Sequence, residues 1–518
     1  MYRYIVVASL LAAGCASAGM ERAAEPARVA AVDAWQLPAL PPAAPMDADE
    51  YARRRAALLS TLGGGVLVVT GGPPPAHDYL PFAQDHDFRY LTGITEPGAA
   101  YVAVKAGGRV EEFLFVQPRD PAREAWEGAR LGPDGASARV GIPALNATRF
   151  VAFLDSVVAE HRVVHVSAMP PRAPRPDADL SHAEQLLARL QDRRPAAEFR
   201  SVAGRVRQLR ARKSAAELDR IRRAVYISAL AHREAMRATA PAMNEFEIRA
   251  LHEYIYLRNG AEGPAYGSIV GSGPNATVLH YGAADRFMED GELLLVDAAA
   301  SYGGYAADIT RTFPINGRFS PEQRAVYEVV LAAHKAAAGL IRRGATWAEL
   351  QDAANHELRE GMARIGLIDG PDATHDCGTP SSPATCPQYR LFYMHGLGHG
   401  VGLAVHDPDV SELEGFQPGS AVTIEPGIYV RADAFDHLPD TPANRAMAER
   451  LRPAFHRFAG IGVRIEDVYI FDDSGVERAS AGAPREIDEI EALMREASFT
   501  DRSRRADIVE WYRNNQGR

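Results

Sequence analysis

The 518-residue sequence predicts two folded domains, an α/β domain followed by an α+β domain. In the first, residues 47–205, short β-branched runs alternate with amphipathic helices. In the second, residues 206–497, long antiparallel-type strands are bracketed by helices. A long helix marks the boundary, because Ser214 followed by Glu217 three residues later forms a capping box.

The elements of the first domain follow from hydrophobic periodicity. Four short apolar runs bounded by turn residues predict strands within 63–72, 99–106, 111–118 and 161–168. Two segments with helical spacing predict helices at 51–62 and 182–194. The glycines around "VLVVTGG" do not form a phosphate-binding loop, because no Gly-Lys-Ser/Thr follows them.

The second domain begins with two helices. The first buries one face at helical spacing, formed by Leu218, Ile221, Val225 and Ala229. The second ends at Gly260. Strand-rich sequence starts at Tyr266, and the remaining elements are helices within 321–361, strands at 421–430 and 462–471, and an amphipathic helix at 484–497.

The N-terminal 18 residues have the pattern of a secretory signal peptide. Arg3 precedes an apolar run that ends at Gly14, and Ala16-Ser17-Ala18 supplies an A-x-A end. The run is too short to span a bilayer, and a buried first helix is the alternative. "LLAAGC" also resembles a lipobox ending at Cys15, which would add a lipid anchor. We therefore expect an exported protein, periplasmic or secreted, either free or anchored to a membrane.

Residues 19–46 are an Ala/Pro-rich tether and residues 498–518 a C-terminal tail. Besides Cys15 there are two cysteines, Cys377 and Cys386, nine residues apart in a Pro/Ser-rich loop. In an oxidising compartment a local disulfide is expected, with two free surface thiols as the alternative.

The net charge of −10 excludes nucleic acid as a partner, since nucleic acids select basic surfaces.

Three histidines lie within "MHGLGHGVGLAVHD", at positions 395, 399 and 406. Two are four residues apart, as in a zinc-binding helix, but no glutamate follows the first. Each interior glycine costs about 1 kcal/mol in a helix relative to alanine. The segment is therefore predicted to be a strand or loop whose backbone packs closely.

Two aspartates flank a predicted hairpin in "ELLLVDAAASYGGYAADITRTFPI". If Tyr302 and Gly303 form its two-residue loop, Asp297 lies directly opposite Asp308, with Cβ atoms ~5 Å apart. Two facing carboxylates are destabilising unless a proton or a cation neutralises them. A shifted loop that exposes both residues is the alternative.

Two glutamates also lie inside apolar strands, Glu425 in "AVTIEPGIYV" and Glu466 in "IGVRIEDVYIF". Buried carboxylates are rare unless they are paired or bind metal. The four carboxylates and one of the histidines would balance two divalent cations. This oxygen-rich set favours Mn²⁺, with Co²⁺, Zn²⁺ or Fe²⁺ as alternatives, and two such ions can share a hydroxide nucleophile.

From residue 214 to 495 the chain resembles the pita-bread metallopeptidases, which include aminopeptidase P, prolidase and methionine aminopeptidase. The matching motifs, in order, are "NATVLHY", "VDAAASYGGYAADITRTFP", "HGLGHGVGLAVHD", "TIEPGIYV" and "GVRIEDV". The resemblance implies a C-terminal pita-bread catalytic domain of α+β type. It also implies a bridging hydroxide that attacks the scissile carbonyl.

The resemblance implies a role for each site residue. The metal ligands would be Asp297, Asp308, His399, Glu425 and Glu466, with Asp308 and Glu466 bridging the two ions. Peptide binding and stabilisation of the tetrahedral intermediate would fall to His280, His395 and His406. Glu425 would handle the proton of the bridging water. Arg464 would hold Asp297 or a neighbouring carboxylate, and Tyr266 occupies a hydrogen-bonding position.

Residues 47–200 resemble the N-terminal domain of aminopeptidase P through "FAQDHDFRYLTGITEPGAAYVAV" and "REAWEGARLG". Methionine aminopeptidases lack this domain and are excluded. The resemblance implies a homo-oligomer in which Trp126 reaches a neighbouring active site, with simple packing of Trp126 as the alternative. "VDAAA" departs from the family's Asp-Ala-Gly. Segment 431–458 is longer than in many bacterial aminopeptidases P and resembles prolidase, and the loop 377–386 resembles an insertion near the site mouth.

Three functions remain open: an aminopeptidase that cleaves before proline in Xaa-Pro peptides, a prolidase restricted to Xaa-Pro dipeptides, and a binding protein without catalysis. A dipeptidase needs a cation for the free carboxylate after proline. The run from Leu391 to Val430 contains no Lys or Arg and offers Ser411, Glu412 and Glu414 instead. We therefore expect an acidic rim and a preference for peptides longer than two residues.

Overall fold

The computed structural model describes residues 46–77, 80–168, 181–379 and 381–500, together with 507, 510, 511 and 514. The signal peptide, Cys15 and nearly all of the tether and the tail lie outside these residues. No helix within the described ranges is long and apolar enough to cross a bilayer. The described residues all belong to one compact unit.

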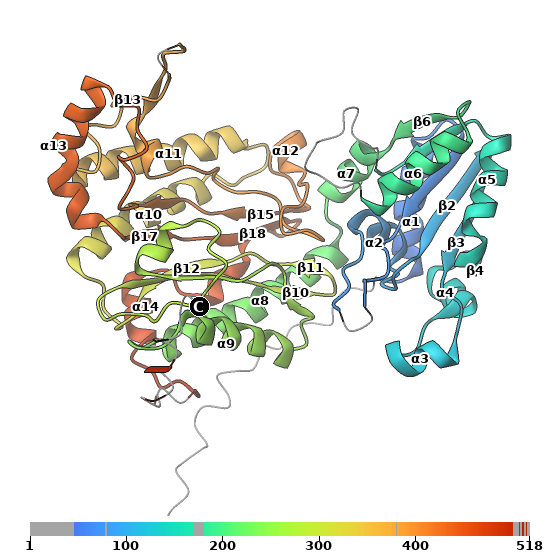
Figure 1. Ribbon diagram of the computed structural model, residues 1–518, viewed down its shortest axis with the longest axis horizontal. Helices are drawn as coiled ribbons and strands as arrows, with labels where there is room; N and C mark the ends of the chain where they lie inside the picture. The colour runs from blue at the N-terminus through green and yellow to red at the C-terminus, as the bar shows by residue number, and fades with distance from the viewer. Residues whose placement is uncertain are drawn as a thin grey trace, which may run out of the picture. The chain divides into compact units, whose positions relative to one another are not determined.

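The N-terminal domain is built on a six-stranded mixed sheet with the order β4-β3-β2-β1-β5-β6 (Figure 1). The central strand β1 pairs antiparallel with β2 and parallel with β5. The strands are β1 (Gly65–Thr70), β2 (Ala100–Ala106), β3 (Arg109–Val116), β4 (Ala144–Asn146), β5 (Val163–Val166) and β6 (Glu198–Ser201).

Apolar residues on both faces of β1 explain why this sheet is covered on both sides. Leu67 and Val69 pack into one core with α1, whereas Val66 and Val68 pack into another with α5 and α6. The helices are α1 (Ala48–Ser60), α2 (His86–Thr92), α3 (Pro121–Glu127), α4 (Gly132–Val140), α5 (Phe150–Glu160), α6 (His182–Arg193) and α7 (Ala203–Ala211). The predicted α/β character of this domain is confirmed.

The C-terminal domain opens with α8 (Ala215–Ala238) and α9 (Glu245–Arg258). The Ser214–Glu217 capping box at the start of α8 is present, as the sequence predicts. The predicted apolar face of α8 is also confirmed, since all four of its residues lie in the core. Glu217 has a second role, because it accepts a hydrogen bond from the Tyr305 hydroxyl and lies 3.3 Å from Arg54 of α1.

Antiparallel sheets form the centre of this domain, so the α+β prediction is correct. One sheet has the order β12-β9-β8 and another the order β15-β18-β19, and β15 and β18 lie side by side in Figure 1. The strands up to β12 are β7 (Gly263–Pro264), β8 (Ile269–Ser272), β9 (Leu293–Asp297), β10 (Ala300–Tyr302), β11 (Tyr305–Ala306) and β12 (Thr310–Pro314). The later ones are β15 (Ser420–Ile424), β16 (Gly427–Tyr429), β17 (Gly462–Arg464), β18 (Asp467–Asp472) and β19 (Gly475–Arg478).

The predicted register of the aspartate hairpin is wrong: the two-residue loop lies one position later, which shifts each cross-strand partner by two residues. Tyr302 pairs with Tyr305, so Gly303 and Gly304 form the loop, and Asp297 pairs with Thr310. Both glycines have positive φ, +59° and +82°, which tyrosine at the first loop position would resist. Asp297 ends β9 and Asp308 lies between β11 and β12, so irregular backbone beside the ladder brings the two carboxylates together.

Helices and an inserted hairpin complete the domain. The helices are α10 (Pro321–Ala338), α11 (Trp347–Ile365), α12 (Ser411–Glu414), α13 (Pro442–Phe458) and α14 (Ile487–Leu493). β13 (Thr374–Asp376) and β14 (Thr385–Pro387) form a hairpin that extends away from α11 and α13 in Figure 1. The Cys377–Cys386 disulfide closes it, with Cα atoms 5.7 Å apart, which confirms the predicted pairing.

Candidate metal centre

The four predicted carboxylates and His399 converge on one cavity of about 330 Å³ in the C-terminal domain. Asp297 ends β9, Glu466 immediately precedes β18, and Glu425 follows β15. The hydroxyl of Tyr266 bridges the two aspartates, donating to Oδ1 of Asp297 at 2.6 Å or to Oδ1 of Asp308 at 2.5 Å. The strands thus deliver side chains that are far apart in sequence to a single point.

Arg464 fixes the orientation of two of these carboxylates. Its Nη2 donates to Asp297 at 2.5 Å, as the resemblance implies, and its Nη1 donates to the Tyr429 hydroxyl at 2.9 Å. Its Nε donates to Thr310 at 3.1 Å, and the Thr310 hydroxyl donates in turn to Glu466 at 2.7 Å. One buried guanidinium therefore orients Asp297 directly and Glu466 through a threonine.

The histidine segment is extended and not helical, as predicted. It runs beside β15, where Thr423 N–H donates to the His399 carbonyl and Glu425 N–H donates to the Leu397 carbonyl. A Cβ at Gly398 would lie 2.1 Å from the Thr423 carbonyl oxygen. Gly398 is therefore required for this close approach, which places His399 Nε2 3.4 Å from Glu425 and 3.5 Å from Asp308.

The other three histidines lie around the same cavity. His395 Nε2 is 2.8 Å from the Tyr429 hydroxyl, and its Nδ1 is 3.9 Å from Glu425. The His406 ring centre is 4.0 Å from that of His399. His280 is exposed at the rim. Nine of the ten residues assigned from the sequence therefore line one site: Asp297, Asp308, His399, Glu425, Glu466, His280, His395, His406 and Arg464. The tenth, Tyr266, contacts two of them, Asp297 and Asp308.

Burial controls the protonation of this cluster. It raises the pKa of Asp297 and of Glu466, and it raises that of Glu425 to about 7, in each case with help from neighbouring carboxylates. Burial alone would lower the pKa of His399, but the carboxylates of Asp308 and Glu425 raise it to about 9. Burial lowers the pKa of His395 to about 4, so this imidazole is neutral at physiological pH.

The cluster fits divalent cations. Its raised carboxyl pKa values show that negative charge is unfavourable in this cavity without a counter-ion. Asp308, His399 and Glu466 each offer a ligand atom within 4.8 Å of the others, so one ion can contact all three. Oxygen donors with a single imidazole suit Mn²⁺, Co²⁺, Zn²⁺ and Fe²⁺.

The predicted acidic rim is not present. Ser411 is buried, and the two glutamates form ion pairs outside the cavity, Glu412 with Arg207 at 2.5 Å and Glu414 with Arg212 at 2.9 Å. The sequence pattern wrongly predicted an acidic rim, because the arginines that neutralise these glutamates lie about 200 residues earlier, on or just after α7.

Two residues that the sequence reasoning did not single out belong to the site. Tyr429 contacts both His395 and Arg464, and Thr310 connects Arg464 to Glu466. Tyr429 lies within the motif "TIEPGIYV", four residues after Glu425. Thr310 follows Asp308 by two residues. A search for polar side chains beside each ligand would have found both.

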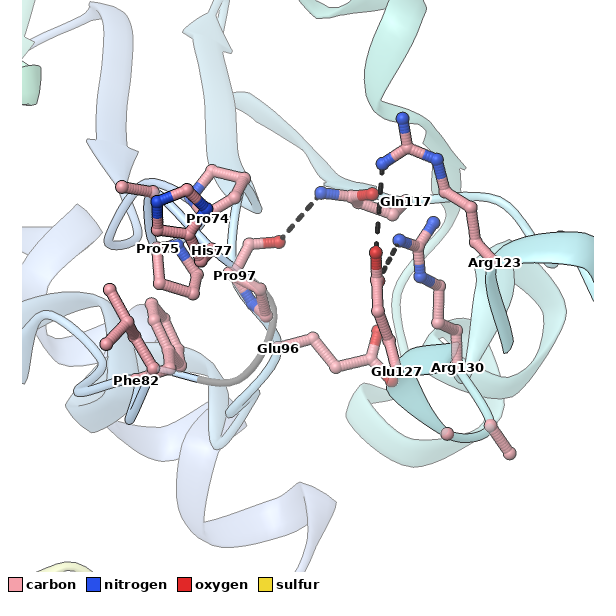
Figure 2. Close-up of a pocket in the computed structure, with 14 residues that line it drawn as sticks. Pro74, Pro75, His77, Phe82, Glu96, Pro97, Gln117, Arg123, Glu127 and Arg130 are labelled. Atoms are coloured by element: carbon pink, nitrogen blue, oxygen red, sulfur yellow. Dashed lines mark hydrogen bonds and ion pairs between the residues drawn. The ribbon is translucent and has the colours of Figure 1, made fainter. Parts of the chain in front are cut away.

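A larger cavity, about 540 Å³, lies in the N-terminal domain and carries no comparable chemistry (Figure 2). Prolines and Phe82 form one wall, and in the other Arg123 and Arg130 are directed toward Glu127. The neighbouring Trp126 on α3 is 83% exposed, so packing within the described part of its own chain does not explain it.

Comparison with known proteins places the chain in a family. The sequence profile of metallopeptidase family M24 matches residues 219–473, and that of the aminopeptidase P N-terminal domain matches residues 51–165. An Xaa-Pro aminopeptidase of Haemophilus influenzae is 35% identical over 422 residues, 80% of this chain and 89% of that protein. A human Xaa-Pro dipeptidase is 37% identical over 302 residues, 54% of this chain and 59% of that protein.

Solved structures agree with this assignment. Aminopeptidase P from Escherichia coli, in its low-pH form, superposes with a TM-score of 0.72 at 31% identity and covers 87% of this chain and 99% of that one. A zinc-substituted form of that enzyme in complex with product gives 0.71 at 30% identity, with the same coverage. The fold and the carboxylate–histidine site together define a metal-dependent peptidase. The chain belongs to metallopeptidase family M24, carries the aminopeptidase P N-terminal domain, and is a metallo-aminopeptidase.

Proposed function

We propose that the protein is an Xaa-Pro aminopeptidase, which releases the N-terminal residue from peptides whose second residue is proline. The observation that carries the proposal is the convergence of four carboxylates and His399 in one cavity, within a chain that also has the aminopeptidase P N-terminal domain. Peptides containing proline are the substrates, and nucleic acid is not a partner.

Asp297, Asp308, His399, Glu425 and Glu466 would hold two divalent ions, most suitably Mn²⁺, with Asp308 and Glu466 shared between them. When bound, such a pair polarises the scissile carbonyl and activates water as the nucleophile. Arg464 keeps Asp297 oriented as a ligand, and the Thr310 hydroxyl keeps Glu466 oriented.

The remaining side chains act on the peptide and on protons. Glu425 lies between His399 and His395, where a carboxylate oxygen can accept a proton from water and later pass it to the leaving nitrogen. His395 is neutral, donates its Nδ1–H to the Gly396 carbonyl and accepts from the Tyr429 hydroxyl at Nε2, so this fixed ring contacts the peptide from the cavity wall. His280 and His406 bind the peptide backbone beside it. Proline lacks an N–H, so a pocket that offers no acceptor there favours it.

Prolidase is the second candidate, supported by the match to a human Xaa-Pro dipeptidase. A binding protein without catalysis is disfavoured, because all five ligand-type side chains are present and converge.

We also propose that the protein is exported and forms a homo-oligomer. The basic, apolar and A-x-A pattern of residues 1–18 and the closed Cys377–Cys386 bridge support export, and the exposed Trp126 supports an oligomer.

The test compares two matched peptides in the presence of Mn²⁺. Ala-Pro-Ala should be cleaved to Ala and Pro-Ala, whereas Ala-Ala-Ala should be cleaved far more slowly or not at all. A chelator should abolish both activities. Equal turnover of the two peptides would contradict the proline requirement, and full turnover in the chelated enzyme would contradict the metal site.

A further inference from the structure

A second polar cavity, of about 340 Å³, is lined by four arginines among its twelve residues and lies apart from the metal centre. The N-terminal domain contributes α1, α2 and α4, and the C-terminal domain contributes α8 and the β10–β11 turn. The charged or phenolic side chains that line it are Tyr51, Arg54, Arg89, Arg139, Arg220, Glu262 and Tyr305. None of these residues has a role in the proposed peptidase reaction.

The side chains that line this cavity carry a net positive charge. Four guanidinium groups line it and only one carboxylate, that of Glu262. Burial raises the pKa of Tyr51, and the positive charges of all four arginines lower it. Glu50 and Glu217 beside Arg54, and Glu262 beside Arg89, offset part of this charge, and the positive charge that remains favours an anion in the cavity.

Two of the four arginines are held firmly in place. Arg54 donates to Glu50 and to the Tyr90 carbonyl, and it lies 3.3 Å from Glu217. Arg89 lies 3.4 Å from Glu262. These contacts fix the guanidinium groups before any ligand arrives, which reduces the entropy lost on binding.

Arg139 has a different environment. It lies in the last turn of α4, is exposed, and reaches the cavity from the open side. It is therefore accessible to a ligand from solvent and can be replaced without disturbing the buried ion pairs. A guanidinium in such a position is suited to close over a bound oxyanion.

We propose that this cavity binds a small multivalent oxyanion, with inorganic phosphate or a phosphate monoester as the chemical class. A tetrahedral dianion accepts several charge-assisted hydrogen bonds at once, and arginine forks match its oxygens. The volume of 340 Å³ leaves room for a small organic substituent on the phosphate. The Tyr51 hydroxyl can donate to the same group, whereas that of Tyr305 already donates to Glu217.

The location gives this site a structural consequence. Glu262 accepts the Gly304 N–H at 2.9 Å, and Gly303 and Gly304 form the turn between Asp297 and Asp308. Arg220 lies against that turn, since a Cβ at Gly303 would be 3.2 Å from its Cδ. A bound oxyanion would therefore connect α1, α2 and α4 to the turn that leads into both aspartates.

The experiment uses the full chain and measures binding of inorganic phosphate by calorimetry, with sodium chloride at equal ionic strength as the reference. Arg139→Gln is the test variant, and Arg149→Gln, an exposed arginine of the same domain outside the cavity, is the matched control. Glucose 6-phosphate and glucose, as a second pair of probes, distinguish a monoester site from one limited to free phosphate.

We expect saturable phosphate binding by wild type and by Arg149→Gln, and binding at least about tenfold weaker in Arg139→Gln, the loss of one charge-assisted contact. Phosphate bound at the metal centre would be unaffected by Arg139→Gln, so equal affinity in the two variants overturns the proposal. Absence of saturable binding by wild type also overturns it. Binding of inorganic phosphate without binding of glucose 6-phosphate would limit the site to the free anion.

Discussion

Arg464 donates to Asp297 across 2.5 Å, and both side chains are buried at the floor of the metal centre. The same guanidinium also holds the Tyr429 hydroxyl and Thr310, so three of its nitrogens each contact a different site residue. A planar fork with fixed donors can do this, whereas the single ammonium of lysine cannot reach all three acceptors.

We therefore predict that Arg464→Lys lowers kcat/KM and metal affinity by about 10- to 100-fold, the usual effect of losing a group that orients a ligand. Metal titration and kinetics on Ala-Pro-Ala would measure both quantities. Arg431→Lys is the control, because Arg431 is an exposed arginine paired with Asp433. Unchanged metal affinity in Arg464→Lys would show that the ligands keep their orientation without the fork.

Asp308 offers a ligand atom within 4.8 Å of those of His399 and Glu466, and it also contacts the Tyr266 hydroxyl. Asp308→Ala should remove a ligand common to both ions, so the purified variant should bind fewer than two metal ions per chain and show no turnover even in excess Mn²⁺. Elemental analysis and activity assays would measure this. Asp473→Ala, an exposed aspartate in the β18–β19 turn, should behave as wild type. Near wild-type turnover with two bound ions would refute the assignment.

The sequence predicted the composition of the site better than its geometry. Carboxylates inside apolar sequence are conspicuous because burial of an unpaired charge is so unfavourable, and this signal identified Glu425 and Glu466. Asp297 and Asp308 were identified as two carboxylates that flank one predicted hairpin. The hairpin register failed because "SYGGY" allows two loops, and only the preference of Gly-Gly for positive φ at both positions distinguishes them.

Other features depended on tertiary contacts that no local pattern contains. The ion pairs of Glu412 and Glu414 join residues about 200 positions apart, so an apparently acidic rim is neutral. The arginine cavity likewise combines α1, α2, α4 and α8, whose arginines are unremarkable in sequence. Local capping and periodicity, in contrast, predicted α8 correctly, because they involve neighbours within one helix turn.

The disulfide should be detectable in natively purified protein. Mass spectrometry without reductant is expected to show Cys377 linked to Cys386, and alkylation of both thiols before reduction would contradict it. A closed loop of this length contributes roughly 2–3 kcal/mol in the chain-entropy model. Asn444 and Thr441, at the start of α13, hold Asp376 independently of the disulfide. The double variant Cys377→Ser/Cys386→Ser should therefore be cleaved faster by a protease between the two positions, with only a small decrease in Tm.

The buried His252 should make the protein sensitive to acid. Burial lowers its pKa from near 6.5 to about 4, so the folded state keeps the ring neutral while the unfolded state takes up a proton. Stability therefore falls as pH decreases from 6.5 to 4, by roughly 3 kcal/mol from this residue. Urea unfolding across this range should show a smaller pH slope for His252→Phe. His356→Phe, exposed on α11, should keep the wild-type slope.

Peptide length is the property that separates an aminopeptidase from a prolidase. The only Lys or Arg among the described residues lining the cavity is Arg464, which is committed to Asp297. Arg431 is paired with Asp433 outside the cavity. The nearest alternative is Arg390, one residue before the cation-free run, whose Nη1 donates to the His395 carbonyl at 3.2 Å and which stacks over Tyr389 and Tyr393.

We predict a higher kcat/KM on Ala-Pro-Ala than on Ala-Pro, because a dipeptide would place its carboxylate beside a cluster of carboxylates with no uncommitted cation in the cavity. The third residue of a longer peptide moves that charge outward and leaves a neutral amide. Kinetics on this matched pair would decide the question. A clear preference for Ala-Pro would mean that a cation does reach the substrate. Arg390→Ala would then identify it: loss of the dipeptide preference in that variant, with activity on Ala-Pro-Ala retained, would establish a prolidase in which Arg390 holds the carboxylate.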